Sequence, residues 1–95
     1  MATLSDDEIR TALAGLPGWE HVESAISRQY RLDGFAGAIA FVVRLSYAAE
    51  AANHHPDVDI RYDKVRITLS THSEGGVTAK DVDLATAIER FAPAQ

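Results

Sequence analysis

The feature that most constrains the fold is a strict alternation of apolar and polar residues across positions 57–70. Apolar residues take every second position in two runs, namely Val58, Ile60 and Tyr62, then Val65, Ile67 and Leu69. Because successive side chains of a strand point to opposite faces of a sheet, each run predicts a strand with one buried face. A tight turn is expected at Asp63-Lys64, so the two strands should form an antiparallel hairpin.

A second pair of strands is predicted within residues 19–32, with a turn at Glu23-Ser24. The residues that share the apolar parity there are Ile26, Tyr30 and Leu32. This parity indicates the buried face of the strand. Arg28 interrupts the pattern. We therefore expect it near an edge of the sheet, with its stem packed and its charged head in water.

Three helices are predicted from apolar residues at helical spacing and from capping residues at their starts. The first spans about Asp6–Ala14, the second runs from Gly34 to about Asn53, and the third runs from about Thr78 to Phe91. The residues expected to cap them are Ser5 with Glu8, then Asp33, then Thr78 with Asp81. These side chains accept hydrogen bonds from backbone N–H groups that have no partner within the helix.

The resulting order, α-β-β-α-β-β-α, predicts a single α+β domain over residues 1–95. Hairpins interleaved with helices build one four-stranded antiparallel sheet with the three helices packed on one face. A chain of 95 residues leaves no room for a second domain, and it has no cysteine to cross-link a small core. Oligomerisation is therefore an expected source of extra stability.

The predicted helix at 34–53 has more apolar surface than one sheet can cover. One face carries Phe35, Ile39, Val42 and Ala49, and a neighbouring face carries Phe41, Leu45, Ala48 and Ala52. Two apolar faces indicate a second partner besides the sheet, and we expect this partner to be another copy of the chain. The alternative is that an alanine-rich helix looks apolar all round without having a partner.

Charge and hydropathy exclude several other functions. The net charge is −5, from nine Lys+Arg against fourteen Asp+Glu, so the chain lacks the basic surface that direct nucleic-acid binding requires. The longest apolar run, at 35–43, is shorter than the roughly 20 residues that cross a bilayer, and the N-terminus does not resemble a signal peptide. We therefore expect no membrane partner and a cytoplasmic location.

Three of the four histidines lie at the ends of predicted elements. His54 and His55 follow the long helix, and His72 follows the last strand. If that strand returns beside the helix end, the three imidazoles can share a cleft, joined by Glu50 and Asp81. Imidazole exists in both protonation states near neutral pH, so such a cluster suits acid–base catalysis.

Two other interpretations of these histidines stay open. A solvent-exposed histidine is usually inert, and we assign His21 to that class. A three-histidine metal site is the more specific alternative. However, adjacent side chains diverge in extended backbone, so binding one ion with both His54 and His55 would require a kink. The metal site is therefore the less favoured interpretation.

The segment at 51–85, together with Glu50 just before it, resembles the pterin-4a-carbinolamine dehydratases. The residues that carry the resemblance are Glu50, His54-His55-Pro56, Tyr62, His72 and Asp81, at the family's spacing. Gly18-Trp19 and the order of elements match as well, so the resemblance covers nearly the whole chain. Val58 is a departure, because some members carry a tryptophan there, which puts substrate affinity in doubt more than the chemistry.

The resemblance implies a dehydratase that converts 4a-hydroxytetrahydrobiopterin to quinonoid dihydrobiopterin and water, in tetrahydrobiopterin recycling. It also implies catalysis without a metal or an organic cofactor, and assembly as dimers or tetramers. By the same resemblance, the expected catalytic residues are His54, His55 and His72, with His54 and His72 as the principal acid–base pair. The expected substrate-binding residues are Glu50, Pro56, Thr71, Ser73, Glu74 and Asp81.

Two further functions are consistent with the same residues. Some members of this family also act as dimerisation partners of a transcription factor, through a helical surface. A chain with this pattern could also act on another pterin. The sequence does not distinguish a dimer from a tetramer, nor does it say which histidine is the acid and which is the base.

Overall fold

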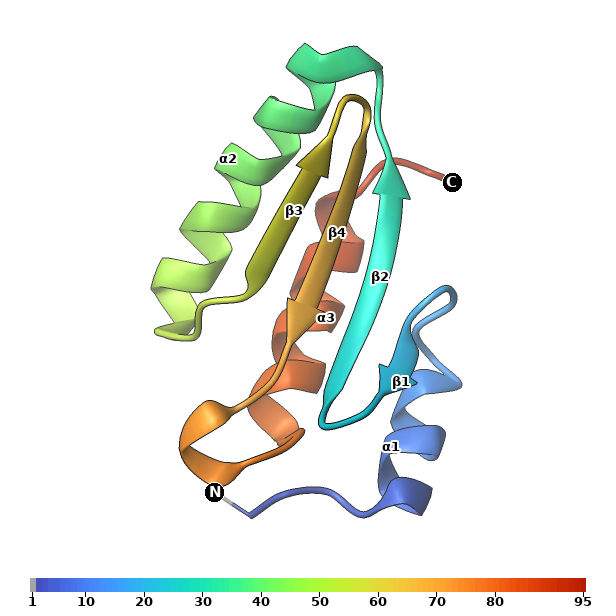
Figure 1. Cartoon of the computed structure of the whole chain (residues 1–95), viewed down its shortest axis with the longest axis vertical. Helices are drawn as coiled ribbons and strands as arrows, with labels where there is room; N and C mark the ends of the chain where they lie inside the picture. Colours follow the sequence, from blue (N-terminus) through green and yellow to red (C-terminus); the bar gives the residue numbers. More distant parts are fainter. Residues whose placement is uncertain (1) are drawn as a thin grey trace.

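The computed structural model describes residues 2–95 and confirms the predicted α+β architecture (Figure 1). In chain order the elements are α1 (Asp6–Leu13), β1 (Glu20–Val22), β2 (Ala25–Arg31), α2 (Gly34–Ala52), β3 (Asp57–Arg61), β4 (Lys64–Leu69), a short 3-10 helix η1 (His72–Glu74) and α3 (Ala79–Phe91). Within this part of the chain the order is α-β-β-α-β-β-α, as the sequence predicts.

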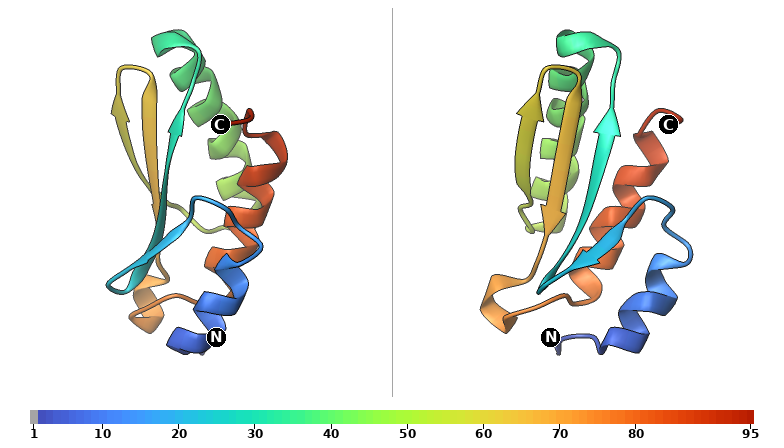
Figure 2. Two further views of the ribbon diagram at one scale, coloured as in Figure 1. Left: turned by 90° about the vertical axis from the view of Figure 1, so that its right-hand side faces the viewer. Right: turned by 45° about the vertical axis from the view of Figure 1, so that its right-hand side comes forward.

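The four strands form one antiparallel sheet in the order β1-β2-β4-β3. The inner pair is in register with Ile26 opposite Leu69, and the outer hairpin places Asp57 opposite Thr68. The helices lie on one face of the sheet (Figure 2). This topology makes β3 an edge strand, and it brings the start of β3 and the end of β4 to the same end of the sheet.

The core lies between the sheet and the helices. Its fully buried strand residues are Ile26, Tyr30, Val65, Ile67 and Leu69, and its helical residues include Phe41, Leu45, Leu84, Ala85 and Ile88. Removing each large side chain from water stabilises the fold by about 1.5–3 kcal/mol. The Tyr30 ring also contacts that of Phe41 in a tilted arrangement, with 5.0 Å between centroids, and the Phe41 ring lies 5.7 Å from that of Phe91, so aromatic contacts join β2, α2 and α3.

The turn between β3 and β4 differs from the prediction. It consists of Tyr62 and Asp63, because Arg61 pairs with Lys64. Tyr62 adopts a left-handed φ of 55° and is exposed, so it does not continue the buried face of β3. Its parity in the sequence is that of a strand residue, and only the register of the hairpin shows that the chain has already turned. The predicted turn at Glu23-Ser24 is confirmed.

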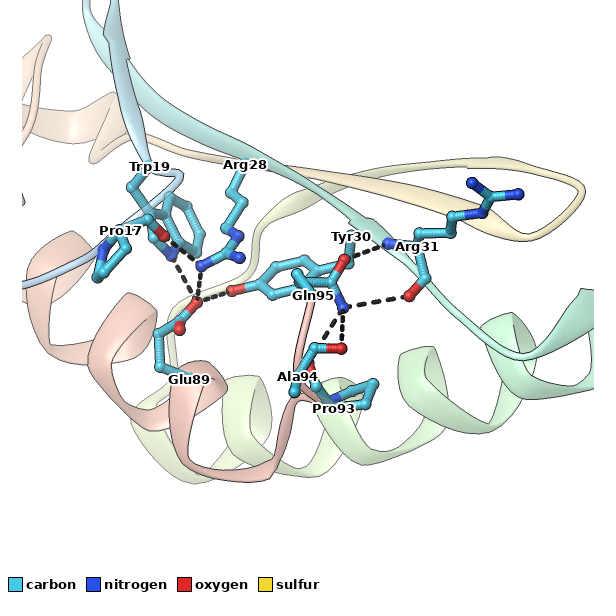
Figure 3. Close-up of polar contacts among 9 residues, drawn as sticks. All are labelled: Pro17, Trp19, Arg28, Tyr30, Arg31, Glu89, Pro93, Ala94 and Gln95. Carbon is cyan, nitrogen blue, oxygen red and sulfur yellow. Dashed lines mark hydrogen bonds and ion pairs between the residues drawn. The ribbon is translucent and has the colours of Figure 1, made fainter.

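β1 pairs with β2 only at residues 25–27, so Arg28 lies beside an open edge of the sheet, as the sequence predicts. The predicted exposure of its charged head is wrong, because only 12% of its side chain is exposed and its guanidinium is 2.8 Å from Glu89 of α3. The same Glu89 oxygen accepts from Trp19 and Tyr30 (Figure 3). Burial, followed by the hydrogen bond to Glu89, raises the pKa of the Tyr30 hydroxyl. A charge can occupy the buried face of this strand because a carboxylate on α3 pairs with it.

Helix α2 completes the core with one face and leaves another in solvent. Ala38, Phe41, Leu45 and Ala49 are buried, whereas Phe35, Ile39, Val43 and Tyr47 are exposed. We call these four exposed residues the apolar stripe. By length and mean hydropathy (1.4), α2 could cross a membrane, but its buried face is part of the core of this domain. Two apolar faces therefore exist. The face with Phe41 and Leu45 packs in the core together with Ala49, and the face with Phe35 and Ile39 is the one left exposed.

Candidate active site

The candidate site begins where α2 ends. Asn53 adopts a left-handed φ of 49°, its N–H donates to the Glu50 carbonyl at 3.1 Å, and the N–H of His54 donates to the Ala49 carbonyl at 3.0 Å. These two bonds form a Schellman motif, which ends the helix and reverses the chain. The backbone of His54 is thereby fixed against the last turn of α2.

The side chain of His54 contacts Asp81 on α3. The distance from His54 Nε2 to Asp81 Oδ1 is 2.5 Å, and the side chains are 10% and 0% exposed. Asp81 is held because it is also the third residue of α3, where its Oδ2 accepts the N–H of Thr78 at 2.8 Å in a capping box. The predicted capping box is confirmed, and it places a buried carboxylate against an imidazole.

Thr71 joins this group from the end of β4. Its hydroxyl donates to Asp81 Oδ2 at 2.9 Å and lies 2.8 Å from the hydroxyl of Thr78. Its backbone N–H donates to Gly76, and its carbonyl accepts from Glu74 and Gly75. Both backbone groups of Thr71 are therefore hydrogen-bonded within the loop, and its side chain is the part that contacts Asp81.

His55 forms a separate and more exposed pair with Glu50. Its Nε2 lies 3.6 Å from Glu50 Oε2, and the side chains are 59% and 75% exposed. The sequence places Glu50 one helical turn before His54, but that spacing applies only within a helix. Because Asn53 ends α2, His54 turns towards Asp81, and Glu50 faces His55 instead. His55, Glu50 and Pro56 line a hollow between α2 and β3.

His72 begins η1, directly after Thr71. His72, Ser73 and Glu74 are exposed in this loop, which a bridge between Thr71 and Gly76 closes at its base. The sheet register brings the loop close to the two other histidines, since β3 starts two residues after His55 and pairs with the end of β4. Figure 1 shows the α2–β3 connection and the η1 loop at the same end of the β3–β4 hairpin, opposite its turn.

The three histidines share an end of the sheet but not one described hollow. His54 lines a hollow between α2 and α3 whose other walls are alanines of α2 together with Lys80, Asp83, Leu84 and Ala87 of α3. His55 lines the hollow beside β3, and His72 lines neither of the two. Within residues 2–95, no three histidine or carboxylate side chains gather in a way that could hold one metal ion.

Comparison with known proteins identifies the family. A family model described as pterin 4 alpha carbinolamine dehydratase matches residues 2–91. The chain belongs to the pterin-4a-carbinolamine dehydratase family.

Its relatives in this family are similar over nearly their whole length. One from Roseiflexus sp. (strain RS-1) is 52% identical over 92 residues, which cover 96% of this chain and 99% of the relative. One from Nocardia farcinica (strain IFM 10152) is 52% identical over 89 residues, which cover 94% of each chain. Both are provisionally named pterin-4-alpha-carbinolamine dehydratase.

Solved structures agree with this placement. The structure described as a transcriptional coactivator/pterin dehydratase from Brucella melitensis has a TM-score of 0.92 at 35% identity, over 96% of this chain and 99% of that one. A pterin dehydratase-like protein described as a RuBisCO assembly factor of the alpha-carboxysome has a TM-score of 0.65 at 17% identity, over 81% of this chain and 89% of that one. At this identity the second likeness shows the shared fold.

One residue of this family member's site is absent from the sequence-based set. Thr78 is fully buried, caps α3 and contacts both Asp81 and Thr71. The sequence identifies it as a helix cap, and the same pattern predicts the carboxylate that it holds. Its contact with Thr71 depends on the bridge at the base of the η1 loop, which no local pattern predicts.

Proposed function

We propose that this chain dehydrates 4a-hydroxytetrahydrobiopterin to quinonoid dihydrobiopterin by histidine acid–base catalysis, as a step in tetrahydrobiopterin recycling. The observation that carries the proposal is the buried His54–Asp81 pair, at the end of the sheet where His55 and His72 also lie. A buried carboxylate that orients an imidazole is a common way of preparing a general acid or base.

The reaction requires two proton transfers. The bond between carbon 4a and its hydroxyl breaks, and the oxygen leaves as water after receiving a proton from an acid. The neighbouring ring nitrogen loses its proton to a base, and its electron pair forms the new double bond to carbon 4a. We assign these transfers to His54 and His72, and each can contribute about 10²- to 10⁴-fold to the rate.

The other predicted residues serve binding and position in this proposal. His55, paired with Glu50, binds the pterin and assists the transfers, and Pro56 fixes the loop that carries both histidines. Ser73 and Glu74, next to His72, line the substrate site. Asp81 orients His54, and Thr71 supports Asp81 through its hydroxyl.

An ultraviolet assay tests the proposal directly. Purified protein is added to freshly generated carbinolamine, and the rate at which the pterin spectrum changes is compared with the spontaneous rate. We expect His54→Ala and His72→Ala each to lower kcat by about tenfold or more. His21→Ala is the matched control, because His21 lies on β1 and lines a different hollow, with α1.

Two outcomes of this assay would contradict the proposal. The first is a wild-type rate equal to the spontaneous one. The second is full turnover by both variants while circular dichroism shows them folded. The same assay after treatment with a chelator tests for a metal requirement, and pterins with other side chains test whether another pterin is the true substrate.

We also propose that the chain is a homodimer or homotetramer through the apolar stripe of α2. The stripe is exposed in one copy, and Val58 of the edge strand β3 is an exposed apolar residue as well. The same surface favours a second candidate function, a binding module for another protein, since the Brucella structure is described as a transcriptional coactivator/pterin dehydratase. Native mass spectrometry distinguishes self-association from binding of another protein. In a pure homo-oligomer, other copies of the chain cover the stripe, so no second protein can bind there.

A further inference from the structure

The hydrogen bonds around Asp81 have a fixed direction. A hydroxyl carries one proton, and that of Thr71 is donated to Asp81 Oδ2. In the contact of 2.8 Å between the two threonine hydroxyls, Thr78 must therefore be the donor. The Thr78 oxygen in turn accepts the N–H of Lys80 at 3.3 Å. The chain of donors runs from Lys80 through Thr78 and Thr71 to the carboxylate.

This chain leaves Asp81 as an acceptor at both of its oxygens. Oδ2 receives the Thr71 hydroxyl and the Thr78 N–H, and Oδ1 lies 2.5 Å from His54 Nε2. The N-terminus of α3 also stabilises negative charge at this position. These contacts favour the ionised carboxylate, so the proton shared with the imidazole belongs to His54.

We infer that Thr71 and Thr78 are positioning residues that, through Asp81, hold neutral His54 in the tautomer protonated on Nε2, so that Nδ1 is the nitrogen that exchanges a proton with the substrate. The inference about the tautomer stands on the hydrogen bonds alone, whereas the role of Nδ1 in catalysis rests on the proposed function. Thr78 therefore has two roles, as the cap of α3 and as a positioning residue for Asp81.

Four charged or titratable side chains near His54 could in principle also hydrogen-bond to His54 or Asp81. Lys80 and Asp83 of α3 line the same hollow as His54, while Glu50 and His55 lie at the end of α2 and pair with each other. None of these four has a side-chain hydrogen bond to His54 or Asp81. A substitution of Thr71 therefore changes the support of Asp81 and leaves the charges around His54 as they were.

The wild-type protein tests the tautomer without any variant. In long-range proton–nitrogen NMR spectra of the full chain with ¹⁵N-labelled histidine, neutral His54 should show a protonated Nε2 and a bare Nδ1. The exposed His21 serves as the reference in the same spectrum. A neutral His54 that is protonated on Nδ1 would overturn the inference, whether or not the protein dehydrates pterins.

Thr71→Val, with Thr71→Ser as the conservative variant, tests the positioning role. Without the Thr71 donor, more of the negative charge of Asp81 is available to His54, which stabilises the imidazolium. We expect the His54 limb of the kcat/KM profile to move to higher pH, kcat to fall several-fold and KM to change little. The serine variant should restore the wild-type profile.

The outcomes separate this inference from the proposed function. If the wild-type enzyme is active and the Thr71→Val profile coincides with it, the positioning role is wrong. If the wild-type protein shows no dehydration, the proposed function fails, and the NMR spectrum still decides the tautomer. If Thr71→Val does not fold, the wild-type spectrum alone can overturn the inference, because it requires no substitution.

Discussion

Asn53 is the residue that turns the chain from α2 into the candidate site. Its φ of 49° lies in the left-handed region, which asparagine tolerates better than other residues with a side chain. The bond from the His54 N–H to Ala49 forms only with this geometry. The position of the catalytic candidate therefore depends on the backbone conformation of its neighbour.

Substituting Asn53 tests this dependence. We expect Asn53→Ala to lower the free energy of unfolding by about 1 kcal/mol, because alanine is strained in the left-handed region. Asn53→Gly is the matched control and should be neutral or slightly stabilising. Urea titrations followed by circular dichroism measure both changes. If the alanine variant is as stable as the wild type, the left-handed conformation of Asn53 does not contribute to the free energy of unfolding.

Asp63 gives the second prediction at this scale. Its carboxylate is nearly buried in the β3–β4 turn, 3.4 Å from Lys64 and 3.4 Å from Arg31. Partial burial works against the charge, but these two cations outweigh it and hold the pKa of Asp63 below its usual value. The stabilisation is therefore present above the unfolded pKa of about 3.9 and is lost as the pH falls through the folded pKa.

Asp63→Asn should accordingly have a lower Tm than the wild type at neutral pH. In acid, where Asp63 of the wild type is protonated, the two Tm values should approach each other. Thermal melts across a pH series measure the effect. Asp59→Asn is the matched control on the same hairpin, because its ion pair with Arg61 is exposed and should change the Tm little. A difference between Asp63→Asn and wild type that stays constant from neutral pH into acid would contradict the linkage.

At the scale of elements, sequence periodicity predicts the helices and strands well, and it misplaces residues whose partners are distant in sequence. The β3–β4 pairing follows from alternation, but the predicted turn is one residue too late. The prediction counts Tyr62 as part of the strand because it has the parity of a strand residue. The edge position of Arg28 is predicted, but its charged head is expected in water, because its partner Glu89 lies 61 positions away in the sequence. Capping boxes are local and are therefore predicted correctly at α1 and α3. The predicted cap of α2 is wrong in one respect, because Asp33 occupies the capping position but its side chain makes no hydrogen bond to the helix.

The candidate site shows the same limit. The sequence brings His54, His55, His72, Glu50 and Asp81 to one end of the sheet, because element ends can be placed from topology. It does not predict which carboxylate serves which histidine. That choice depends on the left-handed Asn53, which takes His54 away from Glu50, and on Thr71, which reaches Asp81 from another element.

Glu89 attaches α3 to the sheet, and its removal gives a prediction for this element. One oxygen of Glu89 accepts from Trp19 at 3.1 Å, from Arg28 at 2.8 Å and from Tyr30. Glu89→Ala leaves a guanidinium that is 12% exposed without its carboxylate. We expect a loss of about 3 kcal/mol in the free energy of unfolding.

Glu89→Gln is the comparison variant, since its amide oxygen can still accept hydrogen bonds and should reduce the loss. Urea titration of both variants measures the difference. An alanine variant as stable as the wild type would mean that water replaces the carboxylate without cost. Dehydratase activity of the folded fraction should be unchanged, because Glu89 lies near the far end of α3 from Asp81.

For the whole molecule, the apolar stripe of α2 is the surface through which we expect copies of the chain to associate. A small domain without cross-links gains stability by burying such a surface. Val43 is 49% exposed in one copy and lies outside the core, and Tyr47 is 74% exposed. A charge placed there should therefore disturb association and leave the fold of the single chain intact.

Val43→Asp tests this proposal. We expect the wild type to have a mass in solution that is a multiple of 10.3 kDa, and the variant to shift towards the mass of one chain while its circular dichroism remains that of the folded protein. Thr11→Glu adds a charge on the exposed surface of α1 and should leave the mass unchanged. Because an interface of apolar side chains excludes a buried carboxylate, an unaltered oligomer in the Val43→Asp variant would show that the copies meet elsewhere. A monomeric wild type would instead leave the stripe open for another protein.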